Sequence, residues 1–327
     1  MVPALPRIES RRYPGDLTMP IVPVMEMIGH ASRHGYAVGY FECWNYESVQ
    51  AVADAAEAAR SPVLFGFSGL YLPHEARLVA DRLSALAAMG FAICEALSVP
   101  AHLLFNESSH EDWIRQAIDL QFGMVMFTDE RLNVEELVSR VKAIVGLAHR
   151  SGAAVEGEII PLPGAGGNYH PVPNGAGLGA RLDEFRLTGI EEAEAFVSQT
   201  GVDTFAVNVG QAHWHGRDQA ALDLERVARL AQVLEVPLAL HGASSIRPGD
   251  LTRAIALGVR KVNVGSRLKQ AFFNALREAC LSAGEEYNPY EIVGSGLPGD
   301  VLAAGRRALQ VEVERWMALL GSAGKAG

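Results

Sequence analysis

Two histidines and one carboxylate stand where apolar runs of the sequence end. Glu107 closes the run that begins at Val99, His213 follows the run 202–210, and His241 lies near the end of "PLALHG". Two imidazoles and a carboxylate can hold a divalent transition metal and leave coordination positions open for a substrate. A single histidine at the end of a strand is more often a hydrogen-bonded structural residue. Spacing alone therefore leaves a metal site and a structural role both open.

Further polar residues accompany these three. Glu156 and Glu158 are two residues apart in one apolar run, so a strand would place both on the same face. The histidines 102, 170 and 215 have simpler explanations as a buried structural residue, a surface residue and a solvated loop residue.

The elements that position these residues alternate along the chain. Amphipathic helical patterns, several of which end in glycine, separate apolar runs that are rich in β-forming residues. Runs apolar on both faces indicate a parallel sheet covered by helices. The eight predicted strands are 38–43, 62–68, 99–106, 123–128, 153–160, 202–210, 237–242 and 261–266.

Eight such units predict an α/β protein with the (β/α)8 TIM-barrel fold and an extra C-terminal helix. We expect a single domain over 1–327, with the barrel at about 20–284 and a helical extension at about 285–327. The main alternative is a doubly wound open sheet. Such a sheet usually carries a glycine-rich phosphate fingerprint after its first strand, and "FECWNYES" is not one. The segment 161–185, dense in Gly, Pro and Asn, predicts a long functional loop.

Two loops near the end of the barrel suggest anion binding. "HGASS" and "NVGS" each place small residues and a hydroxyl before a helical pattern. Free backbone N–H groups at a helix N-terminus attract anions, and the loops after strands seven and eight of a barrel commonly bind phosphate. Ordinary helix N-caps are the alternative interpretation.

Composition excludes several classes of partner. The 327 residues are 49% hydrophobic and 20% charged, with a net charge of −10 and no block of Lys and Arg. Nucleic acid and anionic membrane surfaces are therefore not expected partners. The N-terminus lacks the apolar core of a signal peptide, and no apolar run reaches 18 residues, so we expect a cytoplasmic protein. The widely spaced Cys43, Cys94 and Cys280 argue against a disulfide framework.

Several longer segments resemble the class II, metal-dependent ketose-bisphosphate aldolases, which include the fructose-1,6- and tagatose-1,6-bisphosphate enzymes. "GVDTFAVNVGQAH" resembles the family's "GVDALAVAIGTSH", "PLALHGASSI" its "PLVLHGGSGI", and "RKVNVGSRLKQAF" its "AKVNIDTDLRQAF". The opening "YAVGYFECWNYESVQAVADAAEAARSPVLFGFS" resembles its first two units. The resemblance covers residues 20–284 and implies a barrel enzyme that forms dimers or tetramers.

The resemblance also assigns roles to individual residues. "VPAHLLFNE" aligns with the family's "VPVALHLDH", so Asn106 falls on the catalytic Asp and Glu107 on the first zinc-binding His. The other two zinc histidines correspond to His213 and His241, and Glu158 matches an acidic position near the metal. Thr128 and Gly265 each replace an Asp, and Asn263 keeps the position that touches the enediolate. The substrate- or phosphate-binding positions implied are Ser68, Gly210, Gly242, Ser244 and Ser266, whereas Ala243 and Ser245 replace glycines.

These departures from the family pattern affect residues that take part in the reaction. In the family the metal polarises the ketose carbonyl, and the Asp exchanges a proton with the hydroxyl of the departing aldehyde. An amide can hold that hydroxyl but cannot take its proton. We therefore expect the base among Glu42, Glu156, Glu158 and His170. A carboxylate in place of an imidazole shifts the metal preference from zinc toward iron, manganese or cobalt.

The sequence thus predicts a divergent class II aldolase-like lyase that uses a divalent metal on a ketose, phosphorylated or not, or a related carbonyl substrate. We expect a homo-oligomer that acts on a sugar or sugar phosphate. Two alternative functions remain open. One is another metal-dependent reaction on the same barrel, such as isomerisation, epimerisation or non-haem iron chemistry. The other is a non-catalytic homologue.

Overall fold

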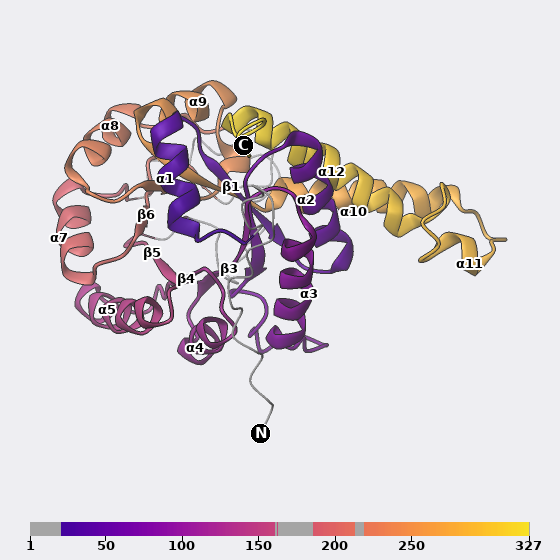
Figure 1. The fold of residues 1–327 in the computed structure, drawn as a ribbon, viewed down its shortest axis with the longest axis horizontal. Helices are drawn as coiled ribbons and strands as arrows, with labels where there is room; N and C mark the ends of the chain where they lie inside the picture. The colour runs from indigo at the N-terminus through magenta and orange to yellow at the C-terminus, as the bar shows by residue number, and fades with distance from the viewer. Residues whose placement is uncertain (1–20, 161, 163–185, 213–218, 327) are drawn as a thin grey trace, which may run out of the picture.

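The computed structural model describes residues 21–160, 162, 186–212 and 219–326. Within these residues, eight parallel strands pair in sequence order and close into a barrel, with β8 beside β1. Figure 1 shows the helices as an outer layer around the strands. The predicted TIM-barrel fold is confirmed, and the open doubly wound sheet is excluded because a closed barrel has no edge strands.

The strands lie where the apolar runs predict them, with ends that shift by a few residues. They are β1 (Val38–Cys43), β2 (Val63–Ser68), β3 (Ala101–Ser108), β4 (Met124–Phe127), β5 (Ala154–Gly157), β6 (Thr204–Ala206), β7 (Leu238–Leu240) and β8 (Val259–Val264).

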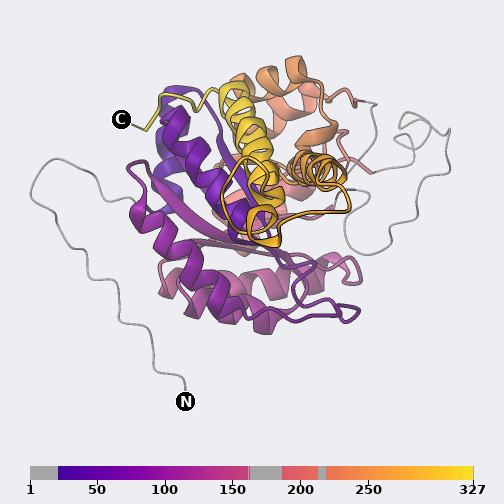
Figure 2. The same ribbon diagram turned by 90° about the vertical axis from the view of Figure 1, so that its right-hand side faces the viewer.

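Local capping signals begin several of the helices. Asn45 and Ser48 form a reciprocal capping box at α2, and Asn133 and Glu136 form one at α5. Figure 2 shows the helical layer from the side. Its members are α1 (Val24–His34), α2 (Tyr46–Ala59), α3 (Leu83–Ala96), α4 (Glu111–Asp119), α5 (Val134–Arg150), α7 (Ile190–Thr200), α8 (Leu224–Val233), α9 (Pro248–Leu257), α10 (Ser266–Ser282), α11 (Pro289–Ile292) and α12 (Val301–Leu320), with a short 3₁₀ turn η1 (Ala243–Ser245).

One predicted helix was wrong in its first half. The pattern "HEARLVADRLSALAAMG" predicts a helix from His74, but α3 begins at Leu83. Leu78 is fully exposed and Val79 is mostly exposed. Because these apolar side chains have no surface to bury against, periodicity alone does not stabilise a helix there.

Helix α1 was not predicted from the sequence. Its buried residues pack in one cluster with residues of β1 to β5 that face the barrel interior. The members of this cluster are Val24, Met27, Ile28, Ala31, Tyr36, Val38, Tyr40, Leu64, Leu104, Met124 and Ala154. The core therefore continues into the barrel, and the polar side chains lie nearer the C-terminal ends of the strands.

The C-terminal helix α12 packs against both α2 and α10. In Figure 1 the outer part of α10, α11 and the start of α12 extend away from the barrel as an arm. In the part of the chain that the structure describes, no helix is both long and apolar enough to cross a membrane.

Candidate active site

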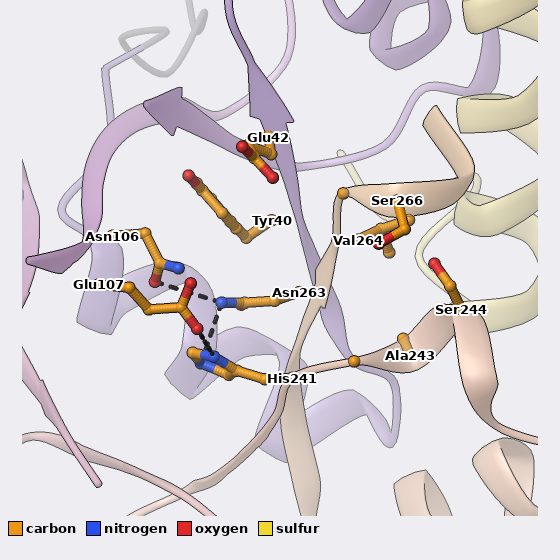
Figure 3. Close-up of a pocket in the computed structure, with 12 residues that line it drawn as sticks. Tyr40, Glu42, Asn106, Glu107, His241, Ala243, Ser244, Asn263, Val264 and Ser266 are labelled. Carbon is orange, nitrogen blue, oxygen red and sulfur yellow. Dashed lines mark hydrogen bonds and ion pairs between the residues drawn. The ribbon is translucent and has the colours of Figure 1, made fainter. Parts of the chain in front are cut away.

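Strand β3 ends in an irregularity that turns two consecutive side chains toward one cavity. Its register with β4 shifts between Phe105 and Ser108, and Glu107 has a φ of 53°. In a regular strand, neighbouring side chains point to opposite faces, whereas a left-handed residue in a bulge breaks that alternation. Asn106 and Glu107 therefore both line the pocket at the C-terminal end of the barrel (Figure 3).

His241 connects Glu107 to the barrel interior. Its Nδ1 lies 2.7 Å from Oε1 of Glu107, and its Nε2 lies 2.8 Å from Oε1 of Glu156. The imidazole is buried directly after β7. Burial opposes a charged ring, but the two carboxylates outweigh it and raise the pKa of His241 to about 10.

A buried ion pair lies below this imidazole. Lys261 Nζ is 2.9 Å from Oε1 of Glu156, and both side chains are 0% exposed. Oε2 of Glu156 accepts from the hydroxyl of Thr204 at 2.9 Å. Burial alone would raise the pKa of Glu156, but Lys261 and His241 lower it to about 2. Glu156 is therefore a fixed anion that orients its neighbours, and the prediction that it could serve as a base does not fit its surroundings.

Asn263 links the ion pair to the pocket wall. Lys261 Nζ donates to its Oδ1 at 2.6 Å, and its Nδ2 donates to Oδ1 of Asn106 at 3.2 Å. Its Nδ2 also lies 3.0 Å from Nε2 of His241. Figure 3 shows the contacts of Asn263 with Asn106 and His241. Together with the bond from Lys261, they hold the amides of Asn106 and Asn263 in one orientation.

Glu158 lies beyond the end of β5, buried beside Thr128. The hydroxyl of Thr128 donates to its Oε2 at 3.4 Å. Burial is the largest cause that raises the pKa of Glu158 to about 8, and the charges of Glu107 and Glu156 act in the same direction against His241. Glu158 therefore carries its proton at neutral pH. Its side chain is not among those that line the pocket.

The two loops predicted to bind anions meet on the other side of the pocket. Ser244 Oγ accepts from the backbone N–H of Arg267 in the first turn of α10, at 3.3 Å. This bond satisfies one of the N–H groups that a phosphate would use. The residues that line the pocket are Tyr40, Glu42, Asn106, Glu107, His241, Gly242, Ala243, Ser244, Asn263, Val264, Gly265 and Ser266.

Gly265, which replaces an Asp of the family, lies beside a carboxylate from another strand. Glu42 at the end of β1 is adjacent to Gly265, because Phe41 pairs with Val264 in the neighbouring strand. A Cβ atom on residue 265 would overlap Oε2 of Glu42. A carboxylate is therefore present at this point of the pocket, supplied by β1.

The structure does not bring every predicted site residue to the pocket. Ser68 lies beside Asn106 in the sheet, but its hydroxyl accepts from the backbone of Leu70. Gly210 forms a turn after β6, where its φ is 112°. Neither lines the pocket. The predictions for residues 170, 213 and 215 lie outside the described residues.

Comparison with known proteins places this barrel in a family. A family model described as "Fructose-bisphosphate aldolase class-II" matches residues 22–325. The chain belongs to the class II fructose-bisphosphate aldolase family. As a member of this family it is an aldolase-like lyase, and metal dependence follows from the family.

Individual family members cover most of the chain. A fructose-bisphosphate aldolase of Thermus caldophilus is 30% identical, over 94% of this chain and 100% of that protein. A fructose-bisphosphate aldolase of Streptococcus pyogenes is 33% identical with the same coverage of both chains. Among solved structures, the YdjI aldolase from Escherichia coli K12 has a TM-score of 0.73 at 25% identity, and the match covers 94% of this chain and 100% of that one.

The described residues of this aldolase family member can be tested for their fit to the divalent metal that the family uses. Among them, no group of three or more His, Cys, Asp and Glu side chains could hold a metal ion. Glu107 and His241 supply one oxygen and one nitrogen donor, which suits a divalent transition metal. Nε2 of His241 faces the carboxylate of Glu156, as the second nitrogen of a metal-binding histidine commonly does. Glu107 and His241 can bind one metal ion together if the ion replaces the proton between Nδ1 of His241 and Oε1 of Glu107.

The sequence did not indicate the roles of the buried Lys261 and of Tyr40, which lines the pocket. Lys261 was assigned only to the start of a strand, and Tyr40 to the interior of one. A lysine two residues before Asn263, on the same strand face, was the available signal for a buried cation. Its partner Glu156 lies on β5, and no local pattern links the two strands.

Proposed function

We propose that this chain cleaves or forms a C–C bond next to a carbonyl group of a hydroxylated substrate, at the pocket that contains Glu107 and His241. The contact between these two side chains carries the proposal, because it joins the end of β3 to the end of β7 in the mouth of the barrel. They would hold a divalent metal together with His213, which lies outside the described residues. When bound, the metal supplies Lewis acidity at the substrate carbonyl.

The chain's own residues would orient the substrate. Asn106 presents an amide, which can hold a hydroxyl but cannot remove its proton. The bond from Asn263 fixes that amide, and Lys261 in turn fixes Asn263. A pre-oriented amide loses little conformational freedom when the substrate binds. We therefore assign to Asn106 the role of positioning the substrate hydroxyl.

Proton exchange needs another group, and we assign it to Glu158, which lies outside the pocket lining and would exchange its proton through one intervening water. Glu156 is committed to Lys261, His241 and Thr204. Glu42 is paired with Lys269. Glu158 has a pKa near 8, close to the range in which a general acid or base works best.

The metal ligand assignment has a direct test. Purified wild-type protein is expected to contain a transition metal, and Glu107→Ala is expected to lose most of it, because the anionic donor of the proposed ligand set disappears. Elemental analysis measures the metal. Metal-dependent exchange of the α-hydrogens of dihydroxyacetone phosphate with deuterated water, followed by NMR, measures carbon deprotonation.

Glu111→Ala is the matched control, since Glu111 is a carboxylate on α4 that pairs with Arg140 outside the pocket. This variant should keep both the metal and the exchange reaction. An absence of transition metal from the wild-type protein, or full metal content in Glu107→Ala, would contradict the proposed ligand set.

We also infer that the chain forms a homo-oligomer through its arm. The arm carries exposed apolar residues, and Tyr290 is 87% and Phe273 57% exposed. Apolar side chains gathered in this way on a surface mark an association site. The others on the arm are Leu281, Tyr287, Val293 and Leu297.

Sedimentation should detect this association. The wild-type chain is expected to sediment as a dimer or tetramer at micromolar concentration, and Leu281→Glu combined with Tyr290→Glu is expected to sediment as a monomer. Leu78→Glu, at an exposed leucine that is not part of the arm, is the matched control and should not change the mass. An unchanged oligomer in the double variant would show that the arm is not the interface.

A further inference from the structure

The hydroxyl group of Tyr40 is buried without a hydrogen-bond partner. Among the described residues it is the one buried side-chain oxygen or nitrogen in this condition. The side chain is 2% exposed and borders the pocket. An unpaired buried hydroxyl is unfavourable, and native proteins rarely keep one without a function.

Packing holds this hydroxyl in place. The Tyr40 ring lies in the apolar cluster of the barrel, with Lys261 Nζ 5.3 Å from its centroid. Tyr40 pairs in register with Asn263 on β8. Figure 3 shows its hydroxyl on the same side of the pocket as Asn106 and Glu42. The ring cannot easily turn the hydroxyl toward another partner, so the group stays directed at the pocket.

Glu42 lies two residues further along β1, on the same strand face. Its Oε1 is paired with Lys269, whose Nζ lies 5.7 Å from the ring centroid of Trp44 and 5.0 Å from that of Tyr71. Its Oε2 occupies the space that a side chain at Gly265 would need. The carboxylate is therefore held at the pocket wall by one of its oxygens.

The hydroxyl donor of Tyr40 and the carboxylate acceptor of Glu42 lie on one wall of the pocket, and together they suit a ligand alcohol group. An alcohol can accept from Tyr40 and donate to Glu42 at the same time. A ketone oxygen can only accept, and the charge of Glu42 would repel a phosphate. The pKa of Tyr40 is raised well above its ordinary value, first by burial and next by Glu42, so its proton is available to donate.

We propose that Tyr40 and Glu42 form a subsite that binds a hydroxyl group of the carbonyl substrate. The subsite rests on the proposed lyase function, since it adds a specificity contact to the same pocket. It makes the substrate a polyhydroxylated carbonyl compound whose hydroxyl at this point carries no phosphate.

Matched pairs of small carbonyl compounds test the subsite on the full-length, metal-loaded chain. Dihydroxyacetone and hydroxyacetone differ by one hydroxyl in the ketone fragment, and glyceraldehyde and 2-hydroxypropanal differ by one hydroxyl in the aldehyde fragment. Ligand-observed NMR titration gives their affinities. The wild type is expected to prefer the hydroxyl-bearing member of at least one pair by about fivefold to tenfold. Tyr40→Phe and Glu42→Gln are each expected to remove that preference.

Two controls make the same changes elsewhere. Tyr36→Phe removes a buried hydroxyl that is bonded to His30, and Glu57→Gln changes a carboxylate that accepts from Ser98. Both should keep the wild-type preference. Tyr40→Phe should also raise Tm, because the hydroxyl it removes has no partner, whereas Tyr36→Phe should lower it. A residue with a purely structural role would not combine higher stability with loss of hydroxyl preference.

Equal weakening of both members of each pair, or an unchanged preference in both pocket variants, would overturn the subsite while leaving the lyase function intact. Failure of the metal-loaded wild type to bind any of the four compounds would reject the proposed function, and the subsite with it. The two failures are therefore distinguishable.

Discussion

Changing Asn106 to Asp and Glu107 to His together is expected to raise the rate of fructose 1,6-bisphosphate cleavage on the order of 10²–10⁴-fold, the range typical of one general acid–base group. The double change restores both residues that the family has at these positions. A coupled assay of the released triose phosphates, with zinc supplied, measures the gain.

The local backbone favours this reversion. Glu107 adopts a φ of 53°, a conformation in which histidine is more common than most other residues. An aspartate at 106 would still accept the hydrogen bond that Asn263 donates. The substitutions therefore fit the existing bulge without a new strain.

Asn133→Asp is the matched control, because it makes the same change at the N-cap of α5, at a residue that does not line the pocket. It should leave the cleavage rate unchanged. A double variant that binds zinc yet cleaves no faster than the wild type would show that the specificity of the pocket has changed as well. Tyr40 and Glu42 would then be the first residues to examine.

The second large effect concerns stability. Lys261→Met is expected to lower the free energy of unfolding by roughly 3–5 kcal/mol, because it leaves the buried carboxylate of Glu156 without its cation. Urea denaturation followed by circular dichroism measures the loss. Combining Lys261→Met with Glu156→Gln should recover part of it, since the uncompensated charge is then removed.

Lys142→Met serves as the control for the loss of a lysine. Lys142 is exposed on α5, and its replacement should change the free energy of unfolding by less than about 0.5 kcal/mol. If Lys261→Met were as stable as this control, the ion pair would not be needed to keep Glu156 buried as an anion.

Charge balance explains why these buried groups occur together. Glu107 and Glu156 contribute two negative charges, and His241 with its raised pKa and Lys261 contribute two positive charges. Buried charges are tolerated when each is paired and hydrogen-bonded. Removing one member leaves the others uncompensated, so we expect the network to respond as a unit and single substitutions not to be additive.

The sequence by itself determined the barrel and the positions of most chemical groups. Alternating apolar runs and helical patterns are local signals, and each strand appeared within a few residues of its predicted bounds. Asn106, Glu107 and His241 were identified because they end such runs, and parallel strands bring their C-terminal ends to one rim. The structure shows these three at one pocket.

Only the tertiary structure decided how those groups face one another. The left-handed backbone at Glu107 depends on the register between β3 and β4, which no local pattern specifies. Glu42 fills the space beside Gly265 because β8 closes onto β1, more than 200 residues away in the chain. Lys261 on β8 contacts Glu156 on β5 across the interior, because closure of the barrel brings these two strands to face one another. Contacts between distant strands depend on closure of the barrel, so residue types and spacing could not reveal them.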